Sequence, residues 1–183
     1  MGGSEPTQLR KRTQLRNGWQ LLVAADGAGA AELAAGQLLG ELRRQGRSSG
    51  KPLGLATGRT MEPVYGALRT RLAQLPARDR QALLDGWHSF NLDEYVGLAP
   101  ADPGSFAAFM GRQLVLPLGL RPDRVRLPDG LAADAAAEAR RYAAALAAAG
   151  GIGLQLLGLG LNGHVGFNEP PCPADAATRV VDL

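Results

Sequence analysis

A glycine-rich segment late in the chain holds the residue types best suited to proton transfer. It spans residues 158–170, Gly-Leu-Gly-Leu-Asn-Gly-His-Val-Gly-Phe-Asn-Glu-Pro. A histidine titrates near neutral pH, and a neighbouring carboxylate can orient its ring, so His164 and Glu169 could move protons together. The alternative is a solvent-exposed loop histidine with no role. Because the apolar run Ile152–Leu157 comes first, we expect a loop at the carboxyl end of a buried strand, where α/β folds place ligands.

A pair of carboxylates follows a second apolar run. Asp93 and Glu94 come directly after Trp87–Leu92, which is predicted to be a strand of the same sheet. A carboxylate at that edge can act as a general base on a carbon acid or as a metal ligand. The alternative is a helix cap or a turn acid. We predict no metal, because no recognised spacing of metal ligands occurs.

The third candidate is an anion-binding turn. Thr57, Gly58, Arg59 and Thr60 lie between a short apolar run, Leu53–Ala56, and a predicted helix. Backbone N–H groups, two hydroxyls and the helix dipole would suit a phosphate, and Arg59 could add a charged donor. The alternative is an ordinary turn with Thr60 as the N-cap of the helix. The spacing alone does not decide between them.

One motif match is rejected. Gly158, Gly160 and Gly163 have the spacing of a dinucleotide-binding fingerprint. That fingerprint must open a helix whose N-terminus holds the pyrophosphate, and the prolines after Glu169 prevent a helix there. The sequence therefore predicts no dinucleotide cofactor, and none of another kind is indicated.

These segments are embedded in alternating strand and helix patterns, which predict an α/β protein with a mostly parallel sheet. The predicted strands are Trp19–Ala25, Leu53–Ala56, Trp87–Leu92, Ile152–Leu157 and Arg179–Leu183. The predicted helices are Ala28–Arg44 (capped by Asp26), Thr60–Leu75, Asp79–Leu84, Ser105–Leu114 and Leu131–Ala149, with a loop at 46–50 and an irregular stretch at Pro117–Pro128.

Length and composition predict one domain over residues 19–183, after a disordered, polar and basic tail over residues 1–18. The basic residues near Arg10 could form a nucleic-acid patch, but without interleaved aromatic residues we predict a solvated tail and no nucleic-acid partner. The single cysteine, Cys172, fits a reducing cytosol and is predicted to be a bystander. No signal peptide and no run of ~20 apolar residues is found, so we predict a cytoplasmic protein without a membrane partner.

The three candidate segments together resemble the glucosamine-6-phosphate deaminase (isomerase) family. This family lies within the glucosamine/galactosamine-6-phosphate isomerase and 6-phosphogluconolactonase superfamily. The matching segments are 53–58, 90–98 and 158–170, in the family's order and at similar separations. The last is the most specific, because 6-phosphogluconolactonases share its Gly-His core but continue differently. The resemblance runs from about Trp19 to Leu183.

The resemblance implies a three-layer α/β/α Rossmann-like sandwich. It also implies that glucosamine 6-phosphate and water become fructose 6-phosphate and ammonia, without a cofactor or metal. Asp93 matches the base that moves the C2 proton towards C1, and His164 matches the group that opens the pyranose ring. Asn162 and Glu169 match residues that position that histidine. The predicted substrate-binding residues are Thr57, Gly58, Arg59, Thr60, Glu94 and Gly163.

The chain departs from the family at two places. The family's anion turn usually has a small residue and a proline where this chain has Arg59 and Met61, and the arginine could either crowd the phosphate or add a charge. Family members usually continue past Leu183, and the later part supplies an arginine and a lysine to the phosphate. The chain also stops inside a predicted strand, so we expect a domain truncated at its C-terminus.

These departures keep other functions open. One alternative is a 6-phosphogluconolactonase-like enzyme or another sugar-phosphate isomerase. Another is a non-catalytic sugar-phosphate binder or an inactive remnant. Family members often form homo-oligomers, so a homo-oligomer is also implied.

Overall fold

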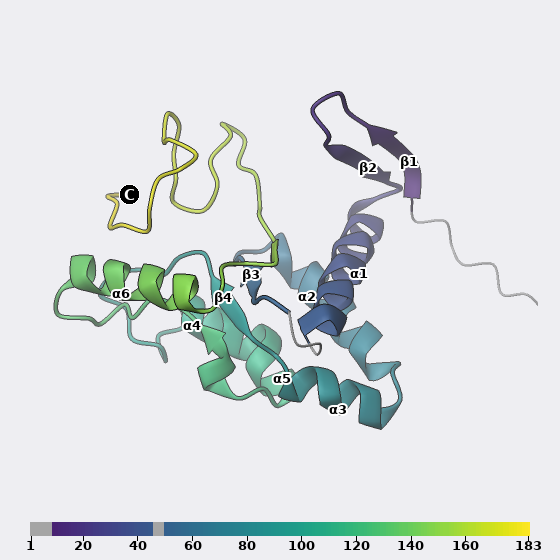
Figure 1. Ribbon diagram of the computed structural model, residues 1–183, viewed down its shortest axis with the longest axis horizontal. Coiled ribbons are helices and arrows are strands. Elements are labelled where there is room, and N and C mark those ends of the chain that lie inside the picture. The colour runs from purple at the N-terminus through teal and green to yellow at the C-terminus, as the bar shows by residue number, and fades with distance from the viewer. Residues whose placement is uncertain (1–8, 46–49) are drawn as a thin grey trace, which may run out of the picture.

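The computed structural model describes residues 9–45 and 50–183. At its centre lies a parallel four-stranded sheet in the order β5-β4-β3-β6, flanked by helices (Figure 1). The strands are β3 (Leu53–Leu55), β4 (Ser89–Asn91), β5 (Val125–Arg126) and β6 (Leu154–Gln155). The predicted α/β fold with a parallel sheet is therefore confirmed.

The strand order places a topological switch point between β3 and β6. From β3 the chain moves outward to β4 and then to β5, and it returns to pair β6 with the other side of β3. The connection from β3 to β4 contains helices α2 (Met61–Ala73) and α3 (Ala77–Asp85), and the connection to β6 contains α6 (Ala135–Ala148). Open α/β sheets bind ligands beyond the carboxyl ends of the strands at such a point. The loops after β3 and β6 are the two that diverge there.

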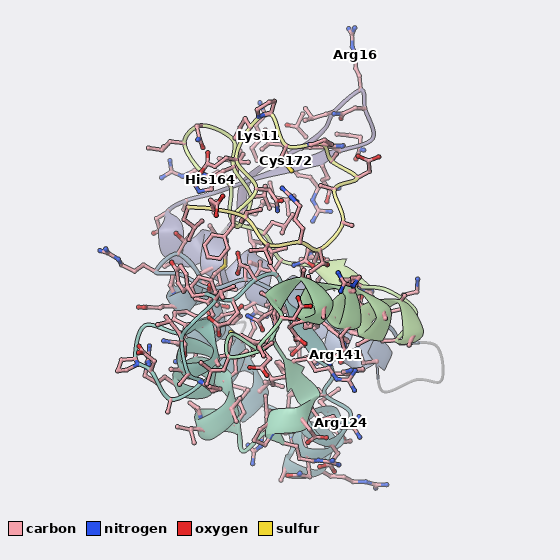
Figure 2. All side chains as sticks on the ribbon, turned by 90° about the vertical axis from the view of Figure 1, so that its left-hand side faces the viewer. Lys11, Arg16, Arg124, Arg141, His164 and Cys172 are labelled. Carbon is pink, nitrogen blue, oxygen red and sulfur yellow. The ribbon has the colours of Figure 1, made fainter. Side chains whose placement is uncertain are left out.

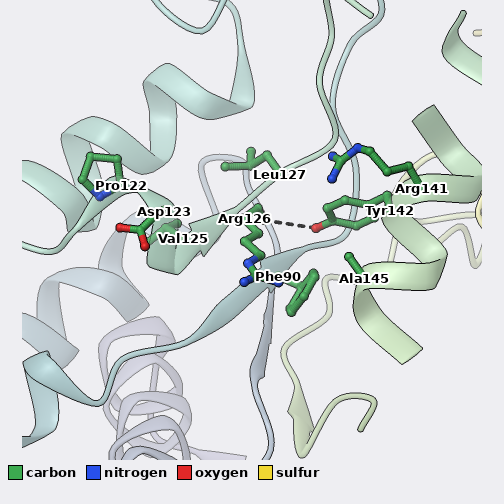
Figure 3. Close-up of a pocket in the computed structure, with 9 residues that line it drawn as sticks. All are labelled: Phe90, Pro122, Asp123, Val125, Arg126, Leu127, Arg141, Tyr142 and Ala145. Atoms are coloured by element: carbon green, nitrogen blue, oxygen red, sulfur yellow. Dashed lines mark hydrogen bonds between the residues drawn. The ribbon is translucent and has the colours of Figure 1, made fainter. Parts of the chain in front are cut away.

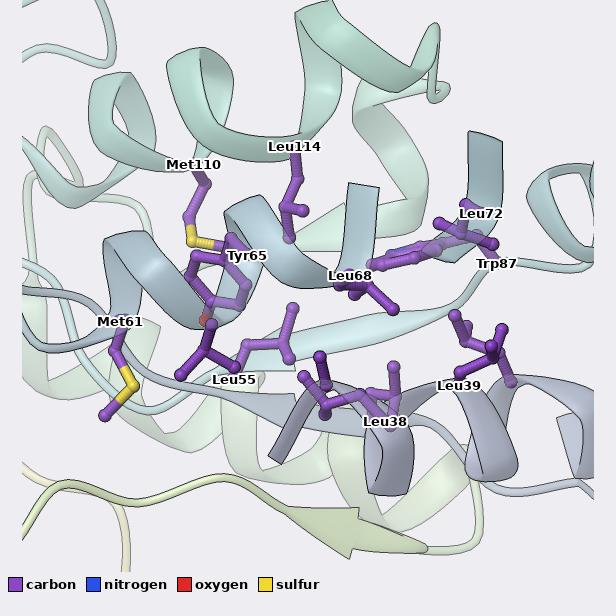
Figure 4. Packing of buried hydrophobic residues seen from close by; sticks show 14 of the residues in the cluster. Leu38, Leu39, Leu55, Met61, Tyr65, Leu68, Leu72, Trp87, Met110 and Leu114 are labelled. Atoms are coloured by element: carbon purple, nitrogen blue, oxygen red, sulfur yellow. The ribbon is translucent and has the colours of Figure 1, made fainter. Parts of the chain in front are cut away.

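The main hydrophobic core lies between the sheet and helices α1 (Gly27–Gln45), α2 and α4 (Phe106–Met110) (Figure 4). All three residues of β3 and of β4 are buried, as expected of central strands covered on both faces. The largest fully buried side chains are Trp87, Tyr65, Leu38, Leu42, Leu53, Leu55, Leu68, Leu72, Met110 and Leu114. On the opposite face, Tyr142 of α6 packs edge-on against Phe90 of β4, with ring centroids 5.5 Å apart.

The first three helices lie close to their predicted bounds. Asp26 caps α1, since its carboxylate accepts a hydrogen bond from the Gly29 backbone N–H at 2.8 Å. The last helix, α6, begins at Ala135 rather than at the predicted Leu131. Asp134 explains the later start, because its side chain accepts from the Ala137 N–H at 2.8 Å and so forms the N-cap.

The segment from Phe106 to Arg126 was only partly predicted. Helix α4 continues through the π-helix Gly111–Val115 (η1) into α5 (Leu116–Leu118), beyond the predicted end at Leu114. A 3₁₀ turn, Pro122–Arg124 (η2), then leads into β5, which falls in a stretch predicted to be irregular. Two residues are too short a run to show a strand period, so β5 was missed.

The N-terminal region differs from its prediction. Leu9–Gln14 (β1) and Gln20–Ala24 (β2) form an antiparallel hairpin apart from the parallel sheet (Figure 1). The sequence predicted disorder for residues 1–18, whereas Leu9–Gln14 is a strand. The predicted strand Trp19–Ala25 is confirmed as β2, but it pairs with β1 and does not join the parallel sheet. Cross-strand backbone bonds need no apolar side chain, so polar composition was a poor guide. Residues 1–8 of the predicted tail, and residues 46–49 of the predicted loop, lie outside the described residues.

After β6 the chain runs as loops and turns to Leu183. The predicted strand at Arg179–Leu183 is wrong in this structure, and β6 itself is shorter than predicted. Hydrogen bonds within the segment include those of local turns, such as the Val165–Asn168 bridge, and side-chain bonds such as the one from Arg179 to Asn168. Within residues 9–45 and 50–183, no helix combines the length and the apolar character that membrane crossing requires.

Candidate active site

Asp93 lies just beyond the end of β4 and is largely enclosed. Burial, and then the neighbouring charge of Glu94, raise the pKa of its carboxyl from 3.8 to about 6. A carboxylate with such a pKa is still mostly ionised at neutral pH, yet it binds a proton far more tightly than an exposed aspartate. These are the properties of a general base that must accept a proton and pass it on.

Glu94 has a different role from its neighbour. One of its carboxylate oxygens accepts hydrogen bonds from the backbone N–H groups of Tyr95 (2.8 Å) and Phe106 (2.9 Å). The other accepts from the N–H of Ala107 at 2.8 Å. The carboxylate thus neutralises free donors in the first turn of α4, where negative charge is favourable. Both oxygens accept hydrogen bonds, so Glu94 ties the end of β4 to the start of α4. Its predicted contact with substrate stays a prediction.

His164 is held by a network of three side chains. Its ring nitrogen Nδ1 lies 2.7 Å from Asn162 Oδ1 and 3.3 Å from Glu169 Oε1. Asn162 in turn donates from Nδ2 to Glu169 Oε2 at 2.5 Å. That bond orients the amide so that its oxygen faces the imidazole, and an amide oxygen can only accept. Nδ1 therefore carries the proton in the neutral ring, which leaves the Nε2 lone pair free to act as a base.

Two glycines allow the close approaches around these groups. At Gly166, where φ is +57°, a Cβ atom would lie 2.7 Å from Asp93 Oδ2. At Gly160, a Cβ atom would overlap the ring of His164. Gly163 adopts a φ of +91° in the turn between them. The sequence named Gly163 but missed Gly166, whose only signal was its place two residues after the histidine.

The segment predicted to bind an anion forms a turn between β3 and α2, and we keep the name anion turn for it. Gly58 has a φ of +102° and its carbonyl accepts from the Met61 N–H at 2.9 Å. Thr57 is half-buried, whereas Gly58, Arg59 and Thr60 are exposed. Thr60 is the N-cap residue of α2, but its side chain forms no capping bond because its backbone is already helical (φ −64°, ψ −24°). The alternative correctly predicted Thr60 as the N-cap residue, but no side-chain capping bond accompanies it.

The three segments meet at one edge of the sheet. A Cβ atom at Gly158 would lie 3.3 Å from Met61 Cε, so the start of the 158–170 loop lies beside the anion turn. Further along the same loop, Gly166 touches Asp93. The structure thus places the turn, the carboxylate and the histidine at adjoining strand ends, around the switch point between β3 and β6.

Other reactive groups lie outside this arrangement. Cys172 Sγ is 3.4 Å from Asn168 Oδ1 and 3.2 Å from Arg179 Nη2, on the loop that follows the histidine. Figure 2 shows His164 and Cys172 in the C-terminal loops, far from Arg124 at the opposite end of the molecule. Within the described ranges, no three His, Cys, Asp or Glu residues gather closely enough to hold a metal ion.

A separate cavity of about 300 Å³ lies between α6 and the η2–β5 segment (Figure 3). At its base the Tyr142 hydroxyl lies 2.7 Å from the Asn91 carbonyl oxygen and 3.1 Å from that of Arg126, which it bridges as a donor. The Arg126 guanidinium stands 5.2 Å from the centre of the Phe90 ring. None of the predicted site residues lines this cavity.

The fold is that of an α/β protein, with an enclosed carboxylate, a hydrogen-bonded histidine and a glycine-containing turn around the switch point of a parallel sheet. No family model matches the chain. It is 43% identical over 155 residues to a glucosamine-6-phosphate deaminase of Lysinibacillus sphaericus, covering 84% of this chain and 61% of the relative. It is 42% identical over 164 residues to one of Rhodopirellula baltica, covering 90% of this chain and 62% of the relative.

A solved structure agrees with these relatives. It is described as a monomeric glucosamine-6-phosphate deaminase of the NagB superfamily, and it matches with a TM-score of 0.70 and 34% identity. The match covers 80% of this chain and 57% of that one. The chain is therefore related to the glucosamine-6-phosphate deaminases in sequence and in fold, as its motifs predicted. It spans about 60% of the length of the curated relatives it matches.

Proposed function

We propose that this chain carries the catalytic centre of a glucosamine-6-phosphate deaminase. The reaction converts glucosamine 6-phosphate and water into fructose 6-phosphate and ammonia. The observation that carries the proposal is the pairing of an enclosed carboxylate, Asp93, with a histidine whose Nδ1 is fixed and whose Nε2 is free. The relatives are named glucosamine-6-phosphate deaminases, which supports the choice of substrate.

Ring opening is the proposed role of His164. Its Nε2 takes the proton from the anomeric hydroxyl of the pyranose and returns it to the ring oxygen, which leaves as the bond to C1 breaks. Asn162 and Glu169 hold the Nδ1 proton in place, so the same tautomer is regenerated after each transfer. Glu169 also stabilises the imidazolium that forms in between, because its carboxylate lies 3.3 Å from Nδ1.

Isomerisation is the proposed role of Asp93. The open-chain aldehyde acidifies the C2–H bond, and the Asp93 carboxylate removes that proton while a proton of the C2 ammonium group passes to O1, which gives an enolamine. With a pKa of about 6, the carboxyl can release the proton again to C1, which leaves an imine at C2. Water adds to the imine and ammonia departs, so the atoms balance without a cofactor. General base catalysis of this kind contributes ~10²–10⁴-fold.

Substrate binding is assigned to the anion turn. We propose that Thr57, Gly58 and Thr60 contact the phosphate through backbone N–H and hydroxyl groups. Arg59 is exposed, and we propose that it adds a charged contact to the phosphate rather than crowding it. Gly163 supplies the backbone bend that brings the sugar ring against His164.

The cellular setting is proposed on the same basis. Sugar phosphates are kept inside cells by their charge, so we propose a cytoplasmic enzyme of amino-sugar catabolism. For assembly we propose that the chain can form a homo-oligomer, although the solved relative is described as monomeric.

The test is ammonia release from glucosamine 6-phosphate by the purified chain, with two isosteric variants beside it. Asp93→Asn removes the proposed base, and Asp85→Asn removes an exposed carboxylate of α3 that binds only Gln81. We expect release that is lost by ~10³-fold or more in the first variant and unchanged in the second. Equal rates for the wild type and Asp93→Asn would refute the assignment of the base.

A further inference from the structure

Three aromatic rings meet beside Asp93, and they come from three separate segments. Tyr95 follows β4, Phe106 opens α4, and Phe167 belongs to the loop that carries His164. Their centroids are 4.8 Å apart for Tyr95–Phe106, 5.1 Å for Tyr95–Phe167 and 5.7 Å for Phe106–Phe167. All three distances lie within the range of favourable aromatic pairs. We call these residues the aromatic trio, and residues 158–170 the histidine loop.

Two members of the trio, Tyr95 and Phe106, have backbones that are fixed by hydrogen bonds. Glu94 accepts hydrogen bonds from the N–H groups of both Tyr95 and Phe106, which ties the end of β4 to the start of α4. Ser105 caps the same helix, with its hydroxyl oxygen accepting from the Ala108 N–H at 3.0 Å. The backbone positions of Tyr95 and Phe106 are therefore set by half-buried hydrogen bonds.

The histidine loop has no comparable attachment. Across the described residues, every hydrogen bond made by residues 158–169 has its partner within residues 158–179. Its internal bonds fix its own shape, including the 2.9 Å bond from the Gly160 N–H to the His164 carbonyl. The loop must therefore be held against the sheet by contacts other than hydrogen bonds. Phe167 provides such contacts, because its ring packs on those of Tyr95 and Phe106.

Phe167 is also adjacent to the closest approach between the loop and the catalytic carboxylate. Gly166 lies against Asp93 Oδ2, so any shift of the Phe167 backbone changes that approach directly. His164 precedes Gly166 by only two residues. A movement of ~1 Å in a catalytic group can cost ~10²-fold in rate.

We infer that Phe167 is a positioning residue: by packing on Tyr95 and Phe106 it holds the histidine loop in register with Asp93. The inference rests on the proposed function for its effect on catalysis, but its structural content stands by itself. Loss of the ring should free the loop from the sheet while leaving the internal His164–Asn162–Glu169 network intact, because that network is local.

The test compares three variants by amide hydrogen exchange and by kinetics. Phe167→Leu removes the ring, and Phe167→Tyr retains it. Phe109→Leu is the control: Phe109 lies on α4, as Phe106 does, but its ring faces Tyr65, with ring centroids 6.4 Å apart. In Phe167→Leu we expect exchange in residues 158–170 to rise about tenfold or more, without change in α1 and α2. Phe109→Leu and Phe167→Tyr should leave loop exchange as in the wild type.

Kinetics separate positioning from general destabilisation. Phe167→Leu should lower kcat by about 10- to 100-fold with less than about threefold change in KM, because the phosphate turn is on another strand end. Phe167→Tyr should restore kcat. Unchanged loop exchange in Phe167→Leu, or an equal rise in Phe109→Leu, would overturn the inference. If the wild-type chain releases no ammonia, the proposed function fails, whereas the exchange comparison still decides whether Phe167 holds the loop.

Discussion

The raised pKa of Asp93 predicts a gain of stability in the Asp93→Asn variant that depends on pH. A carboxyl whose pKa is higher in the folded chain binds its proton more tightly there than in the unfolded chain. Between about pH 4 and pH 6 the folded chain keeps a proton that the unfolded chain has released. The free energy of unfolding therefore falls as the pH rises through this window, and it stays lower above it.

The size of the effect follows from the two pKa values. A pKa that rises from 3.8 to about 6 corresponds to about 3 kcal/mol at neutral pH. The carboxyl is incompletely buried, and the loop over it can relax, so the measured value should be about 1–3 kcal/mol. Asparagine has the same shape and no charge, so the variant lacks this cost. It should be more stable than the wild type at pH 7 and nearly as stable as the wild type at pH 4.

The assay is urea unfolding of both proteins at intervals from pH 4 to pH 8, with the slope against urea checked for equality. The free energy of unfolding of the wild type is subtracted from that of the variant at each pH. This difference cancels the contribution of every titrating group except Asp93 and the groups coupled to it. The difference should grow between pH 4 and pH 6 and then level off. A difference that is constant with pH would show that the pKa of Asp93 is ordinary in the folded chain, and the argument for an enclosed base would fail.

Three further predictions concern the surroundings of the base. Gly166→Ala places a methyl group on Asp93 Oδ2 at a φ of +57°, so it should cost about 2 kcal/mol or more by urea unfolding. Gly97→Ala, with φ +92° and open space around it, should cost only the backbone strain. Arg59→Ser should raise KM for glucosamine 6-phosphate about 3- to 10-fold, and an unchanged or lower KM would mean that Arg59 crowds the phosphate. Tyr142→Phe should lose about 1–2 kcal/mol of stability, because a buried carbonyl of β4 loses its donor.

The sequence predicted the parts of the fold whose signal is local. The runs around β3 and β4 are apolar because both faces of those strands are buried, and the helices carry caps such as Asp26. β5 was missed because its two residues are too few to show a strand period. β1 was missed for another reason: the hairpin is held by backbone pairing, to which the exposed, charged side chains of Arg10, Lys11 and Arg12 give no clue.

The same division applies to the site. The His164–Asn162–Glu169 network was predictable, because its members lie within eight residues and their types suit one another. The role of Glu94 was not, since its partners on α4 are twelve and thirteen residues away and are backbone groups. Its predicted function as a substrate ligand drew on its position beside Asp93. Position along the chain could not show that its oxygens accept hydrogen bonds from the start of α4.

The placement of Glu94 explains how a destabilising base can be kept in this fold. An ionised Asp93 disfavours the folded state at neutral pH, and Glu94 adds repulsion by lying beside it. Removing the Glu94 charge would relieve that repulsion, but it would also leave donors at the start of α4 without their acceptor. Because Tyr95 and Phe106 stand on those bonds, the cost would spread to the histidine loop through Phe167. The Glu94 charge that raises the pKa of Asp93 therefore also fixes the backbone of the two residues against which the histidine loop packs.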